Sequence, residues 1–235
     1  MSRRRLNPRA WLGTLAAAAV LAGCAAGSPR PTPAELPPNV DLIGVRQAWH
    51  AKLAPIDFPL QVHTQGSQVL LATGEGTVTT LDARTGGVIG QVSAGAPLSA
   101  GVGSDGTVSA VVTRANQVVA LEGGRELWRH RLPTQSYTAP LVAGGRVFVL
   151  GADRSLTALD GKSGAKLWSL QRPAEPLVLR QAGVLLAVGN TLVAGMAGRM
   201  VGINPDDGGV RWEAPIAAAR GTNDVERLVD LVGPV

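Results

Sequence analysis

A tight turn followed by a tryptophan recurs along the chain and limits its fold more than any other feature. The clearest copy runs from Leu159 to Trp168. Asp160 can accept hydrogen bonds from backbone N–H groups and begin a turn, and Gly164 can adopt the positive φ that closes the turn with a bulge. Trp168 then supplies a large apolar surface that needs a neighbour to cover it. Because internal repeats point to modular architectures, this pattern is the starting point for the fold.

Three other stretches carry the same pattern, residues 81–90, 121–128 and 203–212. The tryptophan places are 41, 38, 40 and 44 residues apart, and glycine replaces tryptophan at the second; they are residues 49, 90, 128, 168 and 212. A period of about 40 residues with short strands is typical of a β-propeller, whose blades are four-stranded sheets. We therefore predict an all-β propeller over residues 41–235, with about four blades and the start of a fifth. The positions that define the repeat are Asp82, Gly86, Trp128, Asp160, Gly164, Trp168, Gly208 and Trp212.

The repeated tryptophans are expected to dock between neighbouring blades, with each indole N–H donating to a backbone carbonyl. This gives them a structural role rather than a role in cofactor binding. Trp49, within residues 45–53, is expected on an isolated strand that no turn precedes. Many propellers use such an N-terminal strand to complete the last blade, which removes exposed sheet edges. The last blade of such a ring is missing here, so we expect the chain to be the N-terminal half of a larger protein.

Residues 1–23 have the features of an export signal, with a basic start, an apolar run from Trp11 to Ala22 and small residues after it. The run is shorter than the roughly 20 apolar residues of a membrane span. Residues 21–24, Leu-Ala-Gly-Cys, match the bacterial lipobox, so Cys24 is predicted to be lipidated and to become the new N-terminus. Ala25 follows it, which by similarity to bacterial lipoproteins implies sorting to the outer membrane. An ordinary signal peptide with a chance cysteine is the alternative.

Residues 24–40 contain five prolines and predict a semi-rigid tether between the lipid and the propeller. The formal charge of +5 falls to +1 when residues 1–23 are left out, because four arginines lie there. A domain near neutrality gives no general reason to expect nucleic acid binding. Cys24 is the only cysteine, so its lipidation leaves no thiol for a disulfide or a thiolate site.

Residues typical of catalysis or metal binding form no pattern in this sequence. The three histidines, His50, His63 and His130, show no metal-ligand spacing. We interpret Asp82, Asp160 and Asp206 as turn caps rather than calcium ligands, because they keep their place in the repeat. No P-loop or nucleophile elbow is found. We therefore expect no enzyme activity, no metal and no cofactor.

Two stretches depart from the repeat and are the candidates for function. Residues 177–180 read Leu-Val-Leu-Arg where the preceding copy turns at once, so Leu177 and Leu179 share one strand face and Arg180 lies on the other. A longer strand with two core leucines and a solvated arginine is the alternative. Residues 220–231 form a long polar connection after the Trp212 strand. Long charged loops on a rigid scaffold are common binding sites, although such a loop can also be decorative.

The lipobox, the proline-rich tether, the tryptophan repeat and residues 221–230, Gly-Thr-Asn-Asp-Val-Glu-Arg-Leu-Val-Asp, together resemble the BamB family. This family comprises lipoproteins of the β-barrel assembly machinery in the Gram-negative outer membrane. The resemblance covers nearly the whole chain and about the first half of an eight-bladed family member. It implies a non-catalytic scaffold on the periplasmic face of the outer membrane, held there by the acylated Cys24.

The same resemblance implies a partner and a patch that binds it. The partner is the central barrel-forming subunit, BamA, contacted through its POTRA domains, and unfolded outer-membrane proteins are further candidate clients. The family's patch contains a Leu-x-Leu-Arg run, matched by Leu177, Leu179 and Arg180, and an Asp-x-Asp pair. Asp230 matches the first acid of the pair, whereas Val232 stands where the second is expected.

Two other functions remain open at the level of the sequence. A quinone-dependent dehydrogenase shares the repeat, and by resemblance it needs a calcium site, a tryptophan stacked on the cofactor and often a pair of adjacent cysteines. A periplasmic sensor or binding propeller is the weaker alternative. Dye reduction with added quinone would indicate the enzyme, and capture of a barrel-assembly subunit would indicate the scaffold.

Overall fold

The computed structural model describes residues 35, 44–172, 183–218, 220, 222, 223 and 229. It divides into two units, Met1–Arg46 and Gln47–Val235. All the strands belong to the second unit, and the fold described below is that of this unit alone. Within the described residues, no helix has the length and apolar character to cross a membrane.

Among the described residues, sixteen strands form four antiparallel sheets of four strands each, which we call blades 1 to 4. Blade 1 consists of β1 (His63–Gln65), β2 (Gln68–Ala72), β3 (Thr77–Asp82) and β4 (Val88–Ser93). Blade 2 consists of β5 (Gly103–Ser104), β6 (Val108–Val112), β7 (Gln117–Glu122) and β8 (Arg125–Arg131). Blade 3 consists of β9 (Leu141–Ala143), β10 (Arg146–Leu150), β11 (Leu156–Asp160) and β12 (Lys166–Leu170). Blade 4 consists of β13 (Val184–Val188), β14 (Thr191–Met196), β15 (Arg199–Ile203) and β16 (Val210–Pro215).

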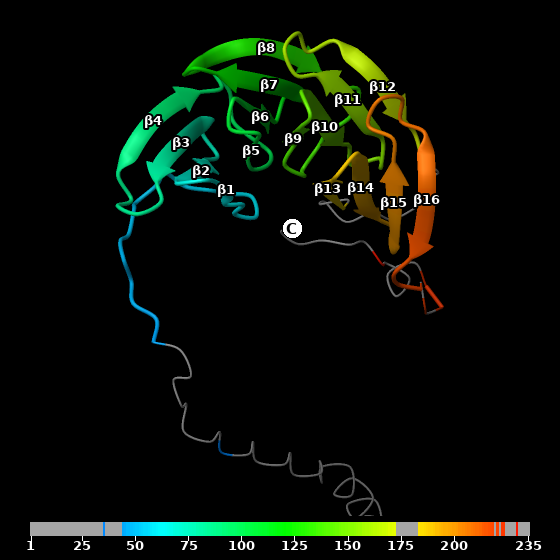
Figure 1. Ribbon diagram of the computed structural model, residues 1–235, viewed down its shortest axis with the longest axis horizontal. Helices are drawn as coiled ribbons and strands as arrows, with labels where there is room; N and C mark the ends of the chain where they lie inside the picture. The colour runs from blue at the N-terminus through cyan, green and yellow to red at the C-terminus, as the bar shows by residue number, and fades with distance from the viewer. Residues whose placement is uncertain are drawn as a thin grey trace, which may run out of the picture. The chain divides into compact units, whose positions relative to one another are not determined.

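The four blades follow one another along an arc, as Figure 1 shows. In each blade the strands pair in chain order, with β1, β5, β9 and β13 on the inside of the arc and β4, β8, β12 and β16 on the outside. The second and third strands are the most buried; β10 is an example, in which four of five residues are buried. Strands covered on both faces read as continuous apolar runs, as residues 147–150 do. The all-β fold with four-stranded blades is therefore confirmed.

The turn between the third and fourth strands is built as predicted in blades 1 and 3. Asp160 Oδ1 accepts hydrogen bonds from the backbone N–H groups of Lys162 (3.1 Å) and Ser163 (2.8 Å). Asp82 Oδ1 accepts in the same way from the N–H of Thr85 (2.8 Å). These carboxylates satisfy donors that the strands leave unpaired.

The glycine that ends each of these turns has the expected positive φ. The angle is 70° at Gly86 and Gly164 and 78° at Gly208. The strand register shifts beside each turn, for example between Ala158 and Leu159, which is the predicted bulge. A side chain at these positions would be strained, because L-residues other than glycine rarely adopt this conformation.

The turn of blade 4 corrects one prediction. Its cap is Asn204, whose Oδ1 accepts from the backbone N–H of Asp206 at 3.3 Å. The Asp206 carboxylate instead pairs with Arg146 of blade 3 at 2.6 Å. Asn204 and Asp160 hold the same place in their turns, because the backbone carbonyl of each accepts from the N–H of the turn glycine, Gly208 or Gly164, at 2.9 Å. Position rather than residue type therefore selects the cap.

Three indoles dock as the repeat predicted, each donating to a carbonyl of a turn. Trp128 of blade 2 donates to Gly161 O of blade 3 at 2.8 Å. Trp168 of blade 3 donates to Pro205 O of blade 4 at 2.9 Å. Trp49 donates to Ala83 O of blade 1 at 2.8 Å, but residues 44–62 contain no strand, so the strand predicted around Trp49 is wrong. Its indole docks without help from strand pairing.

Buried apolar side chains between adjacent blades form three core clusters, one at each interface. The cluster between blades 2 and 3 contains Trp128, and that between blades 3 and 4 contains Trp168, whose ring lies 6.0 Å from that of Phe148. The cluster between blades 1 and 2 contains Phe58, Leu70, Leu98 and Leu121 but no tryptophan. Each blade thus buries its faces against its neighbours, as repeat architectures require.

Candidate binding surface

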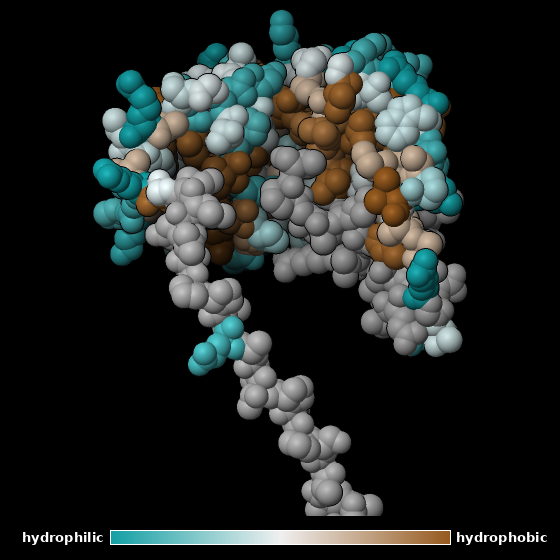
Figure 2. Space-filling view, turned by 60° about the horizontal axis from the view of Figure 1, so that its bottom comes forward, coloured by the Kyte–Doolittle hydropathy of each residue, from teal (hydrophilic) through white to brown (hydrophobic). Residues whose placement is uncertain are grey.

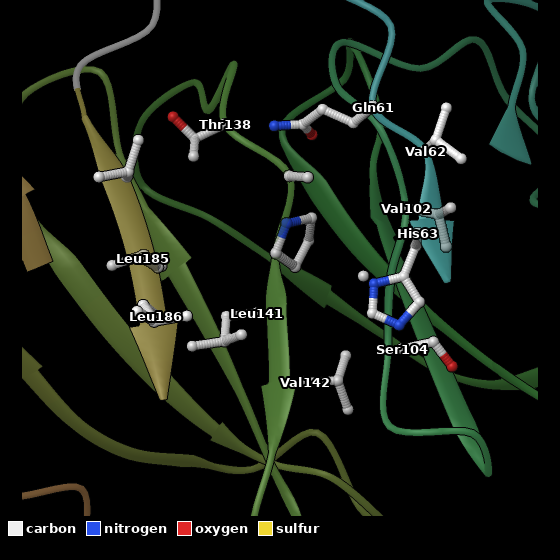
Figure 3. Close-up of a pocket in the computed structure, with 14 residues that line it drawn as sticks. Gln61, Val62, His63, Val102, Ser104, Thr138, Leu141, Val142, Leu185 and Leu186 are labelled. Carbon is white, nitrogen blue, oxygen red and sulfur yellow. The ribbon is translucent and has the colours of Figure 1, made fainter. Parts of the chain in front are cut away.

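The inner strands line a hollow of about 240 Å³ on the concave side of the arc. Figure 3 shows side chains of β13 on one side of the hollow, those around β1 on the other, and Leu141 between them. Figure 2 shows apolar residues gathered on this concave face and hydrophilic residues towards the outer strands. The residues that line the hollow are Gln61, Val62, His63, Val102, Gly103, Ser104, Thr138, Ala139, Pro140, Leu141, Val142, Val184, Leu185 and Leu186.

Close contact between blades keeps the hollow narrow. A Cβ at Gly103 would collide with Pro140 O of the next blade, so only glycine allows β5 to approach the start of β9. Ser136, buried just before this point, donates to Leu150 O at 2.8 Å, and its backbone carbonyl accepts from Ser99 Oγ at 2.7 Å. Backbone contacts of this kind fix the lining side chains in place.

The described side chains that line the hollow are mostly apolar or uncharged. His63 is the one titratable side chain among its lining residues. Across the described part of the chain, no three His, Cys, Asp or Glu side chains are placed to hold a metal ion.

The predicted partner patch lies outside the described residues, and so does Cys24. Leu177, Leu179 and Arg180 fall in residues 173–182, and Asp230 falls among residues 224–235, of which only Val229 is described. The structure therefore does not place these side chains. It does place the residues that flank both segments.

Both flanks lie at the same end of blade 4. Gly183, which follows the first segment, packs so closely on Gly195 O that no Cβ would fit. Val229 lies against the next turn of this sheet, where its Cγ2 is 2.8 Å from the Cβ position of Gly198. Gly195 and Gly198 are three residues apart, on the order of 10 Å along a strand. Gly183 and Val229 therefore both lie at the end of blade 4 where β14 turns into β15.

An ion-pair network ties the start of the first segment to this end. Arg172 Nη2 lies 3.0 Å and 3.1 Å from the two carboxylate oxygens of Glu213 on β16. Arg199 Nη1 lies 3.0 Å from the same carboxylate. Arg172 and Glu213 have exposed side-chain fractions of 23% and 29%, so this network is only partly screened by solvent. It fixes the point from which residues 173–182 begin.

The sequence did not identify the hollow, because its residues carry no local pattern. They come from four blades between residues 61 and 186, with one to three residues from each inner strand. The period of the repeat could locate the inner strand of each blade. That signal names the strand but not the side chains that face inward.

Sequence and structure comparisons give the chain its family. The family model described as outer membrane protein assembly factor BamB matches residues 74–235. The relative from Bordetella pertussis, named outer membrane protein assembly factor BamB, is 35% identical over 99% of this chain. That alignment spans 62% of the relative, so this chain covers less than two thirds of its length. The relatives' common name supports the outer-membrane localisation predicted from the sequence.

Solved structures agree on the fold. BamB from Moraxella catarrhalis superposes with a TM-score of 0.68 at 24% identity, over 77% of this chain and 56% of that one. A quinohemoprotein alcohol dehydrogenase from Pseudomonas putida HK5 superposes with a TM-score of 0.53 at 16% identity, over 68% of this chain and 35% of that one. At these identities the two likenesses show the propeller fold alone. By the family model and its sequence relatives, the chain belongs to the BamB family of outer membrane protein assembly factors.

Proposed function

We propose that this chain acts in a non-catalytic scaffold that binds the POTRA domains of the central barrel-forming subunit during β-barrel assembly in the outer membrane. The carrying observation is that Gly183, which follows the first repeat-breaking segment, and Val229, which belongs to the second, contact the same end of blade 4. Membership of a family of outer-membrane assembly factors supports the process. The apolar hollow with its single titratable group supports binding over catalysis.

The proposed contact patch consists of Leu177, Leu179, Arg180 and Asp230. Two leucines give an apolar anchor, and an arginine can make paired hydrogen bonds to a carboxylate of the partner. Arginine is also enriched among residues that dominate binding energy. Asp230 would orient Arg180 or bind a donor on the partner. The Glu213 network holds Arg172 in place, so the patch begins from a fixed support.

Lipidation of Cys24 would keep this scaffold at the membrane surface. A lipid chain holds a protein on a bilayer without crossing it, and stable anchoring needs more than one chain. Residues 24–40 would then act as the tether that lets blade 4 reach a periplasmic partner. Unfolded barrel proteins are further candidate clients of the same scaffold.

The test is capture of the POTRA domains by the double variant Leu177→Ala/Arg180→Ala. Central interface residues contribute about 2 kcal/mol or more each, so the affinity should fall at least about tenfold. Circular dichroism and thermal unfolding should be unchanged if the patch lies on the surface. Undiminished capture by a folded double variant would reject the patch.

A matched control removes one arginine and one branched aliphatic side chain from blade 1. In Arg84→Ala/Ile89→Ala both altered side chains are exposed, and both lie far along the arc from blade 4. We expect this control to capture the POTRA domains as the unaltered chain does. Equal losses in the two double variants would show a general effect of surface truncation and would count against the patch.

The non-catalytic part of the proposal has its own assay. Pyrroloquinoline quinone and a calcium salt are added to the protein with alcohol and a redox dye. We expect the rate of dye reduction to equal that of the protein-free mixture. Reduction that depends on the protein would assign the chain to the dehydrogenase class instead.

A further inference from the structure

One blade interface lacks the indole that fills the others, and an open cleft lies in its place. Three tryptophans each cover a turn glycine and donate to the carbonyl three residues before it. The carbonyls belong to Ala83, Gly161 and Pro205, and the covered glycines are Gly86, Gly164 and Gly208. Ring atoms lie 2.6 Å, 2.6 Å and 2.7 Å from the Cβ positions of those glycines. The arrangement is the same at all three places.

Strand register identifies the place that has no indole. Trp128, Trp168 and Trp212 pair with Ala120, Ala158 and Gly202 of the preceding strand. In blade 1 the same register pairs Thr80 with Gly90. Gly90 therefore occupies the tryptophan position of β4, and a Cβ built on it meets no atom within 4 Å.

The facing turn in blade 2 is shortened as well. Between β7 and β8 it consists of Gly123 and Gly124 alone. Neither glycine has an atom within 4 Å of its Cβ position, whereas every corresponding glycine elsewhere is covered by a ring. Gly123 directly follows Glu122, as Gly161 follows Asp160, so by its place in the chain its carbonyl corresponds to the indole acceptors of the other blades.

The cleft between these two places has a volume of about 220 Å³. Its floor is apolar and buried, and is formed by Leu70, Val78 and Leu121. Its rim is polar, and includes Gln68, Thr107, Ser109 and Glu122. Pockets for drug-sized ligands hold roughly 300–1,000 Å³, so this cleft suits one side chain rather than such a ligand.

An apolar floor with acceptors at the rim matches the two parts of an indole, a flat apolar body and a single N–H donor. The described tryptophans of this chain are engaged elsewhere: three dock on turns, and Trp212 packs on Gly202 of its own sheet. Because the shortened turn leaves the cleft open at Gly90, Gly123 and Gly124, all exposed, a side chain can enter from outside. Tryptophan is also the residue most typical of binding hot spots in such pockets.

We propose that the cleft between blades 1 and 2 binds a tryptophan side chain presented by another polypeptide. This site is separate from the patch of the proposed function, which lies at the end of blade 4. The bound indole would lie over Gly123 and Gly124 and donate its N–H to the Gly123 carbonyl or to Glu122. The protein's own docking tryptophans thus define the shape and chemistry of the ligand.

The experiment titrates the full chain with a short glycine–serine peptide that carries one central tryptophan, followed by NMR. A matched peptide carries leucine instead. We expect weak saturable binding, with a Kd on the order of 1 mM for a single anchored side chain, and shifts of the Gly90, Gly123 and Gly124 amide signals. The leucine peptide should bind at least about tenfold more weakly. Equal binding of the two peptides, or shifts confined to other residues, would overturn the proposal.

Two variants make the test specific to the cleft. Gly90→Trp fills the cleft from within and should weaken binding of the tryptophan peptide at least about tenfold. Ile89→Trp adds the same side chain one residue earlier, on the opposite face of β4, where Ile89 is 54% exposed. It should bind the peptide as the unaltered chain does. Undiminished binding by folded Gly90→Trp would refute the site, and should that variant not fold, the amide shifts of the unaltered chain decide.

Discussion

The interface between blades 1 and 2 and the interface between blades 2 and 3 use equivalent strands but are closed by different contacts. Between blades 2 and 3, Trp128 covers Gly164 and donates to Gly161 O. Between blades 1 and 2 an apolar cluster with Phe58 closes the interior, and Arg129 donates to Ala94 O at 2.9 Å. The indole and the longer turn are both absent there.

The tryptophan and the longer turn of the next blade are missing together between blades 1 and 2, which shows that they act as one structural unit. A long turn without an indole would leave its glycine and its carbonyl uncovered, and an indole without the turn would lack its acceptor. Apolar packing of the inner and middle strands holds the blades together in both cases. This structural unit therefore adds stability at the outer edge of an interface whose interior is already closed, and its absence leaves room for a ligand.

The largest predicted effect comes from removing an indole. Trp168→Ala deletes a ring that is 8% exposed and belongs to the core between blades 3 and 4. Buried Trp→Ala changes cost about 3–5 kcal/mol, and the variant also loses the bond to Pro205 O. Urea unfolding measures the loss. Trp212→Ala, at a ring 42% exposed, is the control and should cost about 1 kcal/mol or less.

Equal losses of unfolding free energy in Trp168→Ala and Trp212→Ala would contradict the idea that a docked ring stabilises the fold more than an undocked one. In that case the fold would depend on the outer strand itself and not on what its tryptophan covers. A loss of less than about 1 kcal/mol in Trp168→Ala would likewise show that apolar packing closes every interface without help.

The next effect separates two contributions to stability, the packing of an indole on a turn glycine and the strain of a left-handed backbone. Gly164 and Gly124 have similar φ angles, 70° and 79°, but only Gly164 lies under an indole, with Trp128 Cδ2 2.6 Å from its Cβ position. Gly124→Ala should cost about 1–2 kcal/mol for the left-handed backbone alone. Gly164→Ala should cost about 1–3 kcal/mol more, because the methyl group displaces the ring.

Chemical unfolding of both glycine variants gives the difference directly. The change in Trp128 fluorescence offers a second readout, since only Gly164→Ala should move that ring. If the two substitutions cost the same, the close contact of ring and glycine contributes nothing to stability.

The repeat device was predictable from the sequence because its parts are local. Asp160, Gly164 and Trp168 lie within nine residues, and each has a conformational preference that acts on its own neighbours. Gly90 was likewise recognised as the missing tryptophan from spacing alone. In contrast, the cap of blade 4 was misassigned to Asp206, because Asn204 offers the same oxygen from a different residue type.

Features that depend on contacts between blades were not predictable. Trp49 docks without a strand because its indole needs only the turn of blade 1 and not a pairing partner. The open cleft at Gly90 depends on the distant Gly123–Gly124 turn, and no local pattern joins the two. Of the candidate site, the sequence located two repeat-breaking segments, and the structure adds that their flanks meet at Gly195 and Gly198 of blade 4.

A smaller effect, an increase in stability, tests whether the cleft between blades 1 and 2 can accommodate an indole ring. Gly90→Trp should raise the free energy of unfolding by about 1 kcal/mol, because a new ring covers Leu70 and Leu121 and a strand glycine is removed. The gain stays below that of the other docked rings, since the shortened turn covers less of the indole. Ile89→Trp on the exposed face should leave stability within about 0.5 kcal/mol of the unaltered chain. A Gly90→Trp protein less stable than Ile89→Trp would mean that the cleft does not fit a ring.

The smallest effect concerns the turn carboxylates. The pKa of Asp160 lies below its usual value of 3.8, first because the Ser163 hydroxyl donates to it at 2.8 Å and then because the Ser163 backbone N–H does. The folded protein therefore binds this proton less readily than the unfolded chain. Its contribution to stability is complete above about pH 3.8 and is lost as the pH falls through the lower folded pKa. Asp160→Asn should make stability fall less steeply on acidification, and Ser163→Ala, which removes the main donor, should give an intermediate slope. Urea midpoints measured from pH 5 downwards in about half-unit steps test this order, and three parallel curves would contradict it.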